Sequence, residues 1–179
     1  KKQAVDELPQ SGTGKTITTT EPKFIPSEAA QITIGDVTVK TRLIDCVGYM
    51  VDGAVGHMEE DAERMVKTPW SEEEIPFTQA AEIGTDKVMR DHSTIGLVIT
   101  TDGSIGELPR SNYLGAEEKT ILALKKSGKP FLVLVNSQKP YSEETRQVAE
   151  EIGKKYDVAV MPVNCEQLKK EDINRLLEK

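Results

Sequence analysis

The sequence has little of three things that would place it in a special class of protein. It holds 2 cysteines, Cys46 and Cys165, far apart and without the spacing of a metal site or a disulfide framework. It has no excess of positive charge: the net charge is −7, whereas a nucleic-acid-binding surface needs a basic face. No apolar run approaches the ~20 residues of a membrane span, and Lys1-Lys2-Gln3 lacks the apolar core of a signal peptide. We therefore expect a protein of the reducing cytoplasm with no nucleic-acid partner.

The second half of the chain alternates short apolar segments with helical ones. Three segments are almost continuously apolar and branched, as in strands buried on both faces: 95–101, 130–136 and 158–163. Segments with helical spacing of apolar residues follow them: 114–127, 142–155 and 169–179. Ser142 is expected to cap a helix and Gly128 to end one. The alternation predicts an α/β fold with a mostly parallel sheet, as one domain over residues 1–179.

The first half shows a different pattern. Two β-prone segments flank Gly35-Asp36, which predicts a hairpin whose second arm runs on to Asp45 as an antiparallel edge strand of the sheet. Residues 49–72 are polar and are expected to form a long loop with a short helix near 59–66. The acidic run 72–74 is expected to begin a solvated helix, and a longer helix is expected over about 76–92.

The strongest chemical signal is the apolar segment that ends in Asp45-Cys46-Val47-Gly48. In open α/β sheets ligands bind outside the carboxyl ends of strands, so a polar residue at such an end faces the ligand crevice. A carboxylate there can hold Mg²⁺ through water, and a following glycine lets its backbone amide approach a γ-phosphate. Asp45 is thus a candidate catalytic and metal-binding residue, and Gly48 a candidate phosphate contact.

A phosphate-binding loop is not evident. The segment 11–16, Ser-Gly-Thr-Gly-Lys-Thr, looks like one, but Pro9 stands where the motif needs glycine. A β-branched run ended by Pro22 follows it, where the motif needs a helix. We therefore expect a three-layer phosphate-loop nucleotide-hydrolase sheet that lacks its first strand and its phosphate loop. By itself this chain is expected to be inactive.

Thr19 and Thr20 lie in a threonine run upstream of the Asp45 segment. In switch-type nucleotide hydrolases a threonine at this place in the chain binds Mg²⁺ through its hydroxyl and senses the γ-phosphate through its amide. Both are therefore candidate catalytic residues, with Thr20 as a second metal ligand. An edge strand is the alternative explanation of such a run.

The segment Asn136-Ser137-Gln138-Lys139 bears on which base is bound. Proteins that hydrolyse GTP use Asn-Lys-x-Asp at this place, and the aspartate accepts two hydrogen bonds from guanine. Here Lys139 holds that place, a donor without an acceptor. A site without the matching acceptor loses most of its preference for guanine, so ATP is the expected nucleotide. Asn136, Ser137 and Lys139 are the candidate residues on the base side.

Many segments of the chain resemble one family. They include Asp6-Glu7-Leu8-Pro9-Gln10-Ser11, Asp45-Cys46-Val47-Gly48-Tyr49, Thr68-Pro69-Trp70, His92-Ser93-Thr94-Ile95-Gly96 and Ile99-Thr100-Thr101-Asp102-Gly103. The sequence resembles the ATPase domain family of stage IV sporulation protein A, a cytoskeletal ATPase derived from translation-factor-like GTPases.

The resemblance implies several properties. It implies ATP and Mg²⁺ as cofactors, Asp45 as the Walker B aspartate, and Thr19 and Thr20 as sensor threonines. It also implies a homopolymer that forms the base layer of the spore coat on the forespore surface, on the mother-cell side. A small amphipathic membrane-anchoring peptide and other spore coat proteins are the implied partners, through regions outside this chain. Two alternatives remain: a nucleotide-free interaction module of the same fold, and a GTPase.

Overall fold

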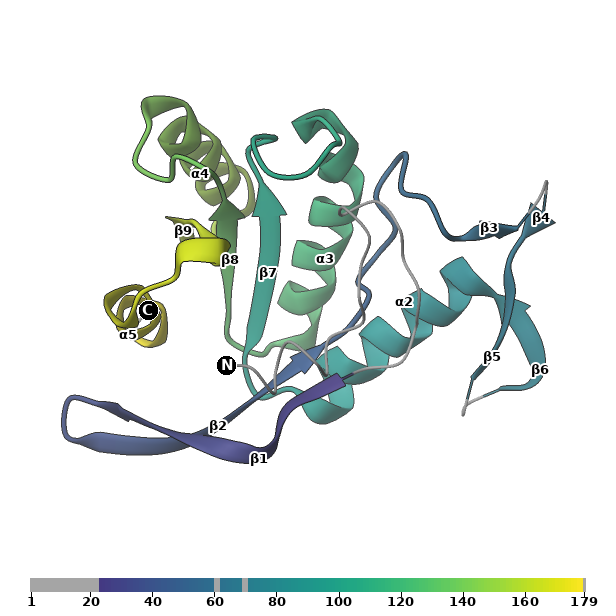
Figure 1. The fold of residues 1–179 in the computed structure, drawn as a ribbon, viewed down its shortest axis with the longest axis horizontal. Helices are drawn as coiled ribbons and strands as arrows, with labels where there is room; N and C mark the ends of the chain where they lie inside the picture. Colours follow the sequence, from purple (N-terminus) through teal and green to yellow (C-terminus); the bar gives the residue numbers. More distant parts are fainter. Residues whose placement is uncertain (1–22, 60–61, 69–70, 179) are drawn as a thin grey trace. The chain divides into compact units, whose positions relative to one another are not determined.

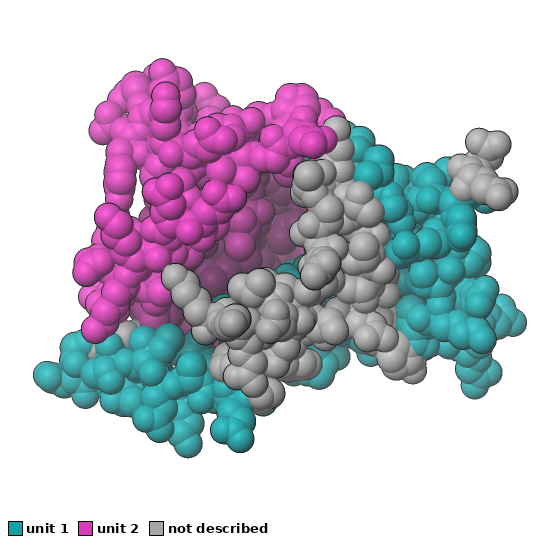
Figure 2. All heavy atoms as spheres, in the orientation of Figure 1, with its two compact units in different colours: residues 1–93 teal, residues 94–179 magenta. Residues whose placement is uncertain are grey.

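A computed structural model describes residues 23–59, 62–68 and 71–178 (Figure 1). By their internal contacts the residues form two compact units, Lys1–Ser93 and Thr94–Lys179, which Figure 2 shows in different colours. The expectation of a single domain over residues 1–179 stays a prediction. Within the described part of the chain, no helix combines the length and the apolarity that crossing a bilayer requires.

A three-stranded parallel sheet forms the centre of the second unit. Strands β7 (Gly96–Thr101), β8 (Phe131–Asn136) and β9 (Val160–Val163) lie side by side in that order. The register places Thr101 beside Asn136, and Asn136 beside Val163. All three strands therefore end at the same edge of the sheet, as Figure 1 shows for β7 and β8. The predicted strands and their parallel direction are confirmed.

Helices cover both faces of this sheet. Helix α3 (Leu114–Ser127) packs on β7, and a Cβ added at Gly96 would lie 2.9 Å from Leu124 Cδ2. Helix α4 (Glu143–Tyr156) contacts β8 and β9 on the same face. The opposite face of the sheet carries four buried side chains: Leu132, Leu134, Met161 and Val163. Leu168 and Leu176 pack against them, and Leu176 belongs to helix α5 (Lys170–Leu177). The second unit therefore has three layers, as expected.

The ends of these helices follow the predicted signals. The Ser142 hydroxyl accepts a 3.3 Å hydrogen bond from the Thr145 backbone N–H, so Ser142 caps α4. Gly128 ends α3 at a φ of 71°, a conformation that glycine adopts without strain.

The first unit contains the predicted hairpin, but its place in the sheet was predicted wrongly. Strands β1 (Lys23–Ile34) and β2 (Val37–Asp45) pair antiparallel around Gly35, whose φ is 56°. In the described residues they pair only with each other and form a sheet of their own, not an edge of the parallel sheet. The reason is visible in β2, whose side chains are all exposed or half-exposed, unlike those of strands packed within a layered sheet.

The segment between this hairpin and the long helix is also different from its prediction. It holds the short strands β3 (Met58–Glu59), β4 (Ala62–Glu63), β5 (Met65–Thr68) and β6 (Ser71–Pro76). The prediction of a short helix near 59–66 is therefore wrong. The β-branched Val66 in β5 pairs with Ile75 in β6. Because of this pairing the acidic run 72–74 lies in an exposed strand, and the prediction that it begins a helix is wrong.

The longer helix is confirmed with a change in its last turn. Helix α2 (Phe77–Lys87) begins after Pro76 and continues as a π-helical turn over Val88–His92. Phe77, Ala80 and Ala81 are buried and form the core of the first unit together with Val88. The predicted span of about 76–92 therefore holds.

Candidate functional site

Polar side chains follow the carboxyl ends of β7 and β8 in the second unit. Asn136 is the last residue of β8, and its side-chain oxygen accepts a 2.9 Å hydrogen bond from the Cys165 backbone N–H. Asn136 thus joins the end of β8 to the segment that follows β9. The base-side role of Asn136 stays a prediction; the structure shows its side-chain oxygen engaged with the Cys165 backbone.

Residues 136–139, which we name the base loop because the sequence predicts a nucleotide base beside them, have two backbone amides held by hydroxyl groups. Ser137 is fully buried, and its N–H donates to the Val163 carbonyl at 2.9 Å. The Ser137 hydroxyl accepts a 2.9 Å hydrogen bond from the Lys139 N–H. The Gln138 N–H donates to the Ser104 hydroxyl at 3.0 Å. The amides of Gln138 and Lys139 are therefore satisfied by side-chain hydroxyl groups, whereas that of Ser137 is satisfied by strand β9.

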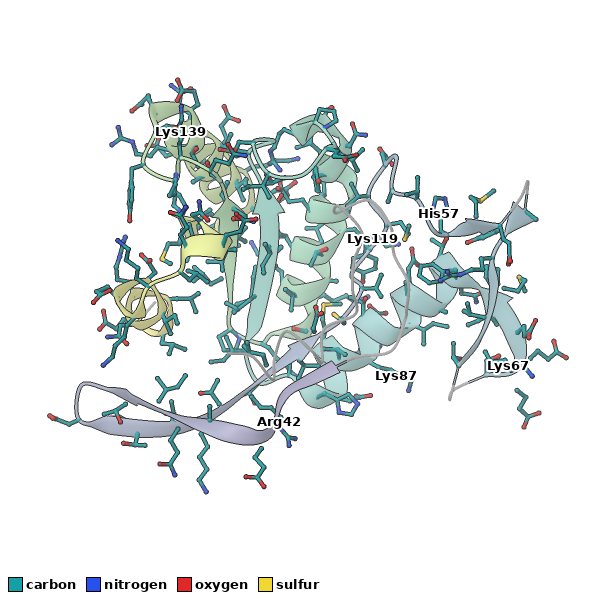
Figure 3. All side chains as sticks on the ribbon, viewed as in Figure 1. Arg42, His57, Lys67, Lys87, Lys119 and Lys139 are labelled. Carbon is teal, nitrogen blue, oxygen red and sulfur yellow. The ribbon has the colours of Figure 1, made fainter. Side chains whose placement is uncertain are left out.

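The Lys139 side chain is exposed and extends from the loop between β8 and α4 (Figure 3). Its ammonium contributes to lowering the pKa of Glu144, after the larger effects of a hydrogen bond to the Glu144 backbone and of the Ser142 hydroxyl. Lys139, a cation with an exposed side chain, thus stands where guanine-binding loops carry an aspartate. A ligand at this loop meets a donor at residue 139, as the sequence indicated.

Sequence reasoning did not name Asp102 as a candidate site residue. It directly follows β7, and its carboxylate accepts hydrogen bonds from the Ser104 N–H at 2.9 Å, the Ser104 hydroxyl at 2.6 Å and the Thr145 hydroxyl at 2.7 Å. Desolvation acts to raise the pKa of Asp102, but the hydrogen bonds from Ser104, Ser137 and Thr145 outweigh it and hold the pKa below its usual value. The signal was available: Asp102 is a polar residue at the end of a buried strand, as are Asp45 and Asn136.

A shallow hollow of about 350 Å³ opens at this edge of the sheet. Its walls include the side chains of Asp102, Ser104, Gln138, Lys139, Ser142 and Glu144. Its volume is at the lower end of the range for small-molecule sites, about 300–1,000 Å³. The walls offer acceptors from Asp102 and Glu144 and a donor from Lys139, so a group that both donates and accepts hydrogen bonds fits them.

The other candidate residues belong to the first unit. Asp45 ends β2 and is open to solvent, yet neighbouring protein desolvates its carboxylate enough to raise its pKa, an effect that a hydrogen bond from the Cys46 backbone partly offsets. Gly48 has a φ of 80°, so a side chain there would be strained even though the space beside it is open. The half-buried thiol of Cys46 has its pKa raised chiefly by desolvation.

The metal site expected at Asp45 and Thr20 can be judged on Asp45 alone, because Thr19 and Thr20 lie outside the described residues. A carboxylate at a strand end is a hard oxygen ligand of the kind Mg²⁺ takes, usually one or two per site with water completing the shell. The donor chemistry of Asp45 therefore fits. No cluster of three or more His, Cys, Asp or Glu side chains able to hold a metal occurs in the ranges that the structure covers.

Comparison with known proteins decides the family. The family model described as "Stage IV sporulation protein A, ATPase domain" matches residues 1–179. The chain belongs to this family. Stage IV sporulation protein A of Bacillus subtilis (strain 168) is 51% identical over 176 residues, which cover 98% of this chain and 36% of that protein.

Two other members of the stage IV sporulation protein A family are equally similar. The Bacillus anthracis protein is 49% identical over 178 residues, which cover 99% of this chain and 36% of that protein. The Clostridioides difficile (strain 630) protein is 51% identical over 174 residues, 97% of this chain and 35% of that protein. The chain thus spans about a third of the length of these relatives. No solved structure matches it.

Proposed function

We propose that this chain is the larger part of a domain that binds and hydrolyses ATP with Mg²⁺, in a sporulation protein that assembles with copies of itself. Membership of a family described by its ATPase domain supports nucleotide hydrolysis. The observation that carries the choice of ATP is the base loop, whose backbone is fixed while an exposed lysine holds the place of the guanine-binding aspartate.

Each candidate residue has a role in this proposal. Asp45 and Thr20 hold Mg²⁺, and the amide of Gly48, like Thr19, contacts the γ-phosphate. Asn136, Ser137 and Lys139 form the base side. Asp45 and Gly48 belong to the first unit, and the base loop belongs to the second. The first strand and the phosphate loop are proposed to lie outside this chain, which by itself is inactive.

The cellular role is proposed from the relatives. The names of three relatives refer to stage IV of sporulation, which supports a role in that process. We propose that the protein polymerises on the forespore surface, in the mother-cell cytoplasm, as the base layer of the spore coat. A small amphipathic membrane-anchoring peptide and other coat proteins are the proposed partners, through regions outside residues 1–179.

Isothermal titration of ATP and GTP tests the proposal. Two proteins are compared: residues 1–179, and a protein extended upstream to include the phosphate loop. We expect the extended protein to bind ATP more tightly than GTP and residues 1–179 to bind neither, because phosphate-loop amides and a lysine supply most of the phosphate contacts. Submicromolar binding of ATP by residues 1–179 would contradict the missing loop. Tighter binding of GTP would favour a GTPase, and no binding by either protein a nucleotide-free interaction module.

A further inference from the structure

Asp102 has no part in the roles proposed above, yet it lies at the centre of the hydrogen bonds behind the base loop. It follows β7, whereas the loop follows β8 and its partner Thr145 lies in α4, 43 positions away in sequence. The cap of α4 is Ser142, so Asp102 is not needed for that purpose. A carboxylate that joins three separate segments requires another explanation.

An ionised carboxylate only accepts hydrogen bonds, and this fixes the direction of the hydroxyl groups around it. The Ser104 hydroxyl donates a hydrogen bond to Asp102 at 2.6 Å. Its oxygen accepts a hydrogen bond from the Gln138 N–H at 3.0 Å. This is the first relay from Asp102 to the base loop.

A second relay leads from the other carboxylate oxygen. The Thr145 hydroxyl donates to Asp102 at 2.7 Å, and the Ser137 hydroxyl lies 3.0 Å from the Thr145 hydroxyl, so the Ser137 proton goes either to the Thr145 oxygen or to the Asp102 carboxylate. The Ser137 oxygen in turn accepts from the Lys139 N–H at 2.9 Å. Ser137 and Thr145 are both buried, so water does not replace these contacts at low cost.

We propose that Asp102 is a positioning residue for nucleotide recognition: through Ser104 and Thr145 it orients two hydroxyl relays that hold the amides of Gln138 and Lys139. The inference rests on the proposed function, because the held loop is the one that contacts the base. It predicts that Asp102 acts on the base and not on the phosphates. The low pKa of Asp102, which keeps the carboxylate ionised at neutral pH, agrees with this role.

The test compares Asp102→Ala and Asp102→Asn in the full-length protein, with Asp172→Ala as control. Asp172 also accepts a backbone hydrogen bond, from Lys169 N–H at 3.0 Å, but it does so at the start of α5. Hydrogen exchange at the amides of residues 138 and 139 reports the loop without any nucleotide. Titration with ATP and with inorganic triphosphate separates the base from the phosphates.

For Asp102→Ala we expect faster exchange at both amides and an about tenfold weaker affinity for ATP, as for the loss of about one positioned hydrogen bond, with unchanged affinity for triphosphate. Asp102→Asn keeps one accepting oxygen, so only one of the two amides should lose protection. Because this variant keeps the size of the side chain, it serves also if Asp102→Ala fails to fold. The control should unfold more readily without changing either affinity.

Unchanged exchange at both amides, or unchanged affinity for ATP in a folded variant, would overturn the inference. A purely structural role would lower the fraction of protein that binds while leaving the dissociation constants alone, and this too would overturn it. A parent protein that binds triphosphate and ATP equally well shows that the loop does not contact the base, which also overturns the inference. A parent that binds neither ligand overturns the proposed function itself, and the inference about recognition with it.

Discussion

The Tyr49 hydroxyl donates a 2.8 Å hydrogen bond to Asp86 Oδ1, which ties the segment after β2 to helix α2. Tyr49 is buried and directly follows Gly48, whose backbone is left-handed. Asp86 also lies 3.6 Å from Arg90 one turn further along the helix. The position of the candidate phosphate-contacting amide therefore depends on a side chain next to it and on α2, 37 positions away.

The first prediction concerns this hydrogen bond and alkaline pH. Desolvation, and then the hydrogen bond to Asp86, raise the pKa of Tyr49 above its ordinary value of 10.0. A raised pKa means that the protonated phenol stabilises the fold fully below about pH 10 and that this stabilisation is lost as the pH rises further. Tyr49→Phe should lower the free energy of unfolding by about 1 kcal/mol at pH 8.

Denaturant unfolding between pH 8 and pH 11 measures this effect. The parent protein should lose stability more steeply than Tyr49→Phe at the alkaline end, so that the two curves converge. Tyr141 is exposed, and Tyr141→Phe is the matched control that should follow the parent curve throughout. Parallel curves for Tyr49→Phe and the parent would show that the phenol does not depend on Asp86.

The second prediction concerns a buried ion pair that supports the loop after β7. Arg110 donates two hydrogen bonds to Glu117, at 2.6 and 2.9 Å, and one to the Thr100 hydroxyl at 2.9 Å. Glu117 is only 5% exposed. Glu117→Ala leaves the Arg110 charge half-buried without its partner, and it should cost about 3 kcal/mol of unfolding free energy.

The next residue in α3 offers the control for this variant. Glu118 forms an exposed pair with Lys155 at 3.5 Å, so Glu118→Ala should cost less than about 0.5 kcal/mol. Replacing both partners, as Arg110→Met with Glu117→Leu, should recover much of the loss because no charge is left unpaired. Thermal and denaturant unfolding of the whole chain measures the change in unfolding free energy for all three variants. Equal costs at residues 117 and 118 would contradict the buried pair.

The fold of the second unit could be predicted from the sequence because its signals are local. Each strand is a short apolar run, and Ser142 and Gly128 mark helix ends through their own side chains and backbone. The short strands between residues 58 and 76 could not be predicted in this way. Val66 and Ile75 become strand residues by pairing with each other across two strands, and a pairing partner is not visible in a single segment.

In the candidate site, too, residues with a local sequence signal could be predicted and residues that depend on distant segments could not. Asn136 and Lys139 were found from a pattern within four residues, and the structure places them on one loop. Asp102 was not found, although it stands at a strand end, because its partners Ser104 and Thr145 come from different segments and hydroxyl groups carry no spacing signal. Groups that act through a relay are recognised only when the fold brings them together.

The third prediction concerns the choice of base. Lys139→Asp restores the acceptor that guanine-binding loops carry at this place, and the Lys139 N–H, already held by Ser137, keeps the backbone in position. In the full-length protein the variant should shift the ratio of GTP to ATP affinity by about tenfold or more toward GTP. Lys139→Ala removes the ammonium without adding an acceptor and should shift the ratio much less. Competition binding measures both variants, and an unchanged ratio in Lys139→Asp would place the base elsewhere.

The last prediction concerns Asp45. An ionised carboxylate holds Mg²⁺ far more strongly than a neutral amide does, so in the full-length protein Asp45→Asn should slow hydrolysis of ATP by about 100-fold or more. Asp36→Asn, an exposed substitution at the tip of the same hairpin, should leave the rate unchanged. Because Asp45→Asn removes a partly desolvated charge, its free energy of unfolding should be unchanged or slightly higher, which separates a lost ligand from a lost fold.

The pH dependence of hydrolysis gives an independent check on Asp45. Desolvation raises the pKa of this carboxylate above its usual value of 3.8, so the active ionised form should disappear, as the pH falls, at a higher pH than for an ordinary aspartate. The residual rate of Asp45→Asn should lack this acid limb. A phosphate-release assay at subsaturating Mg²⁺, where the profile reports the metal-free carboxylate, measures both profiles. If the variant kept the parent's rate and profile, Asp45 would serve only to end β2, and the metal ligands would have to come from other residues.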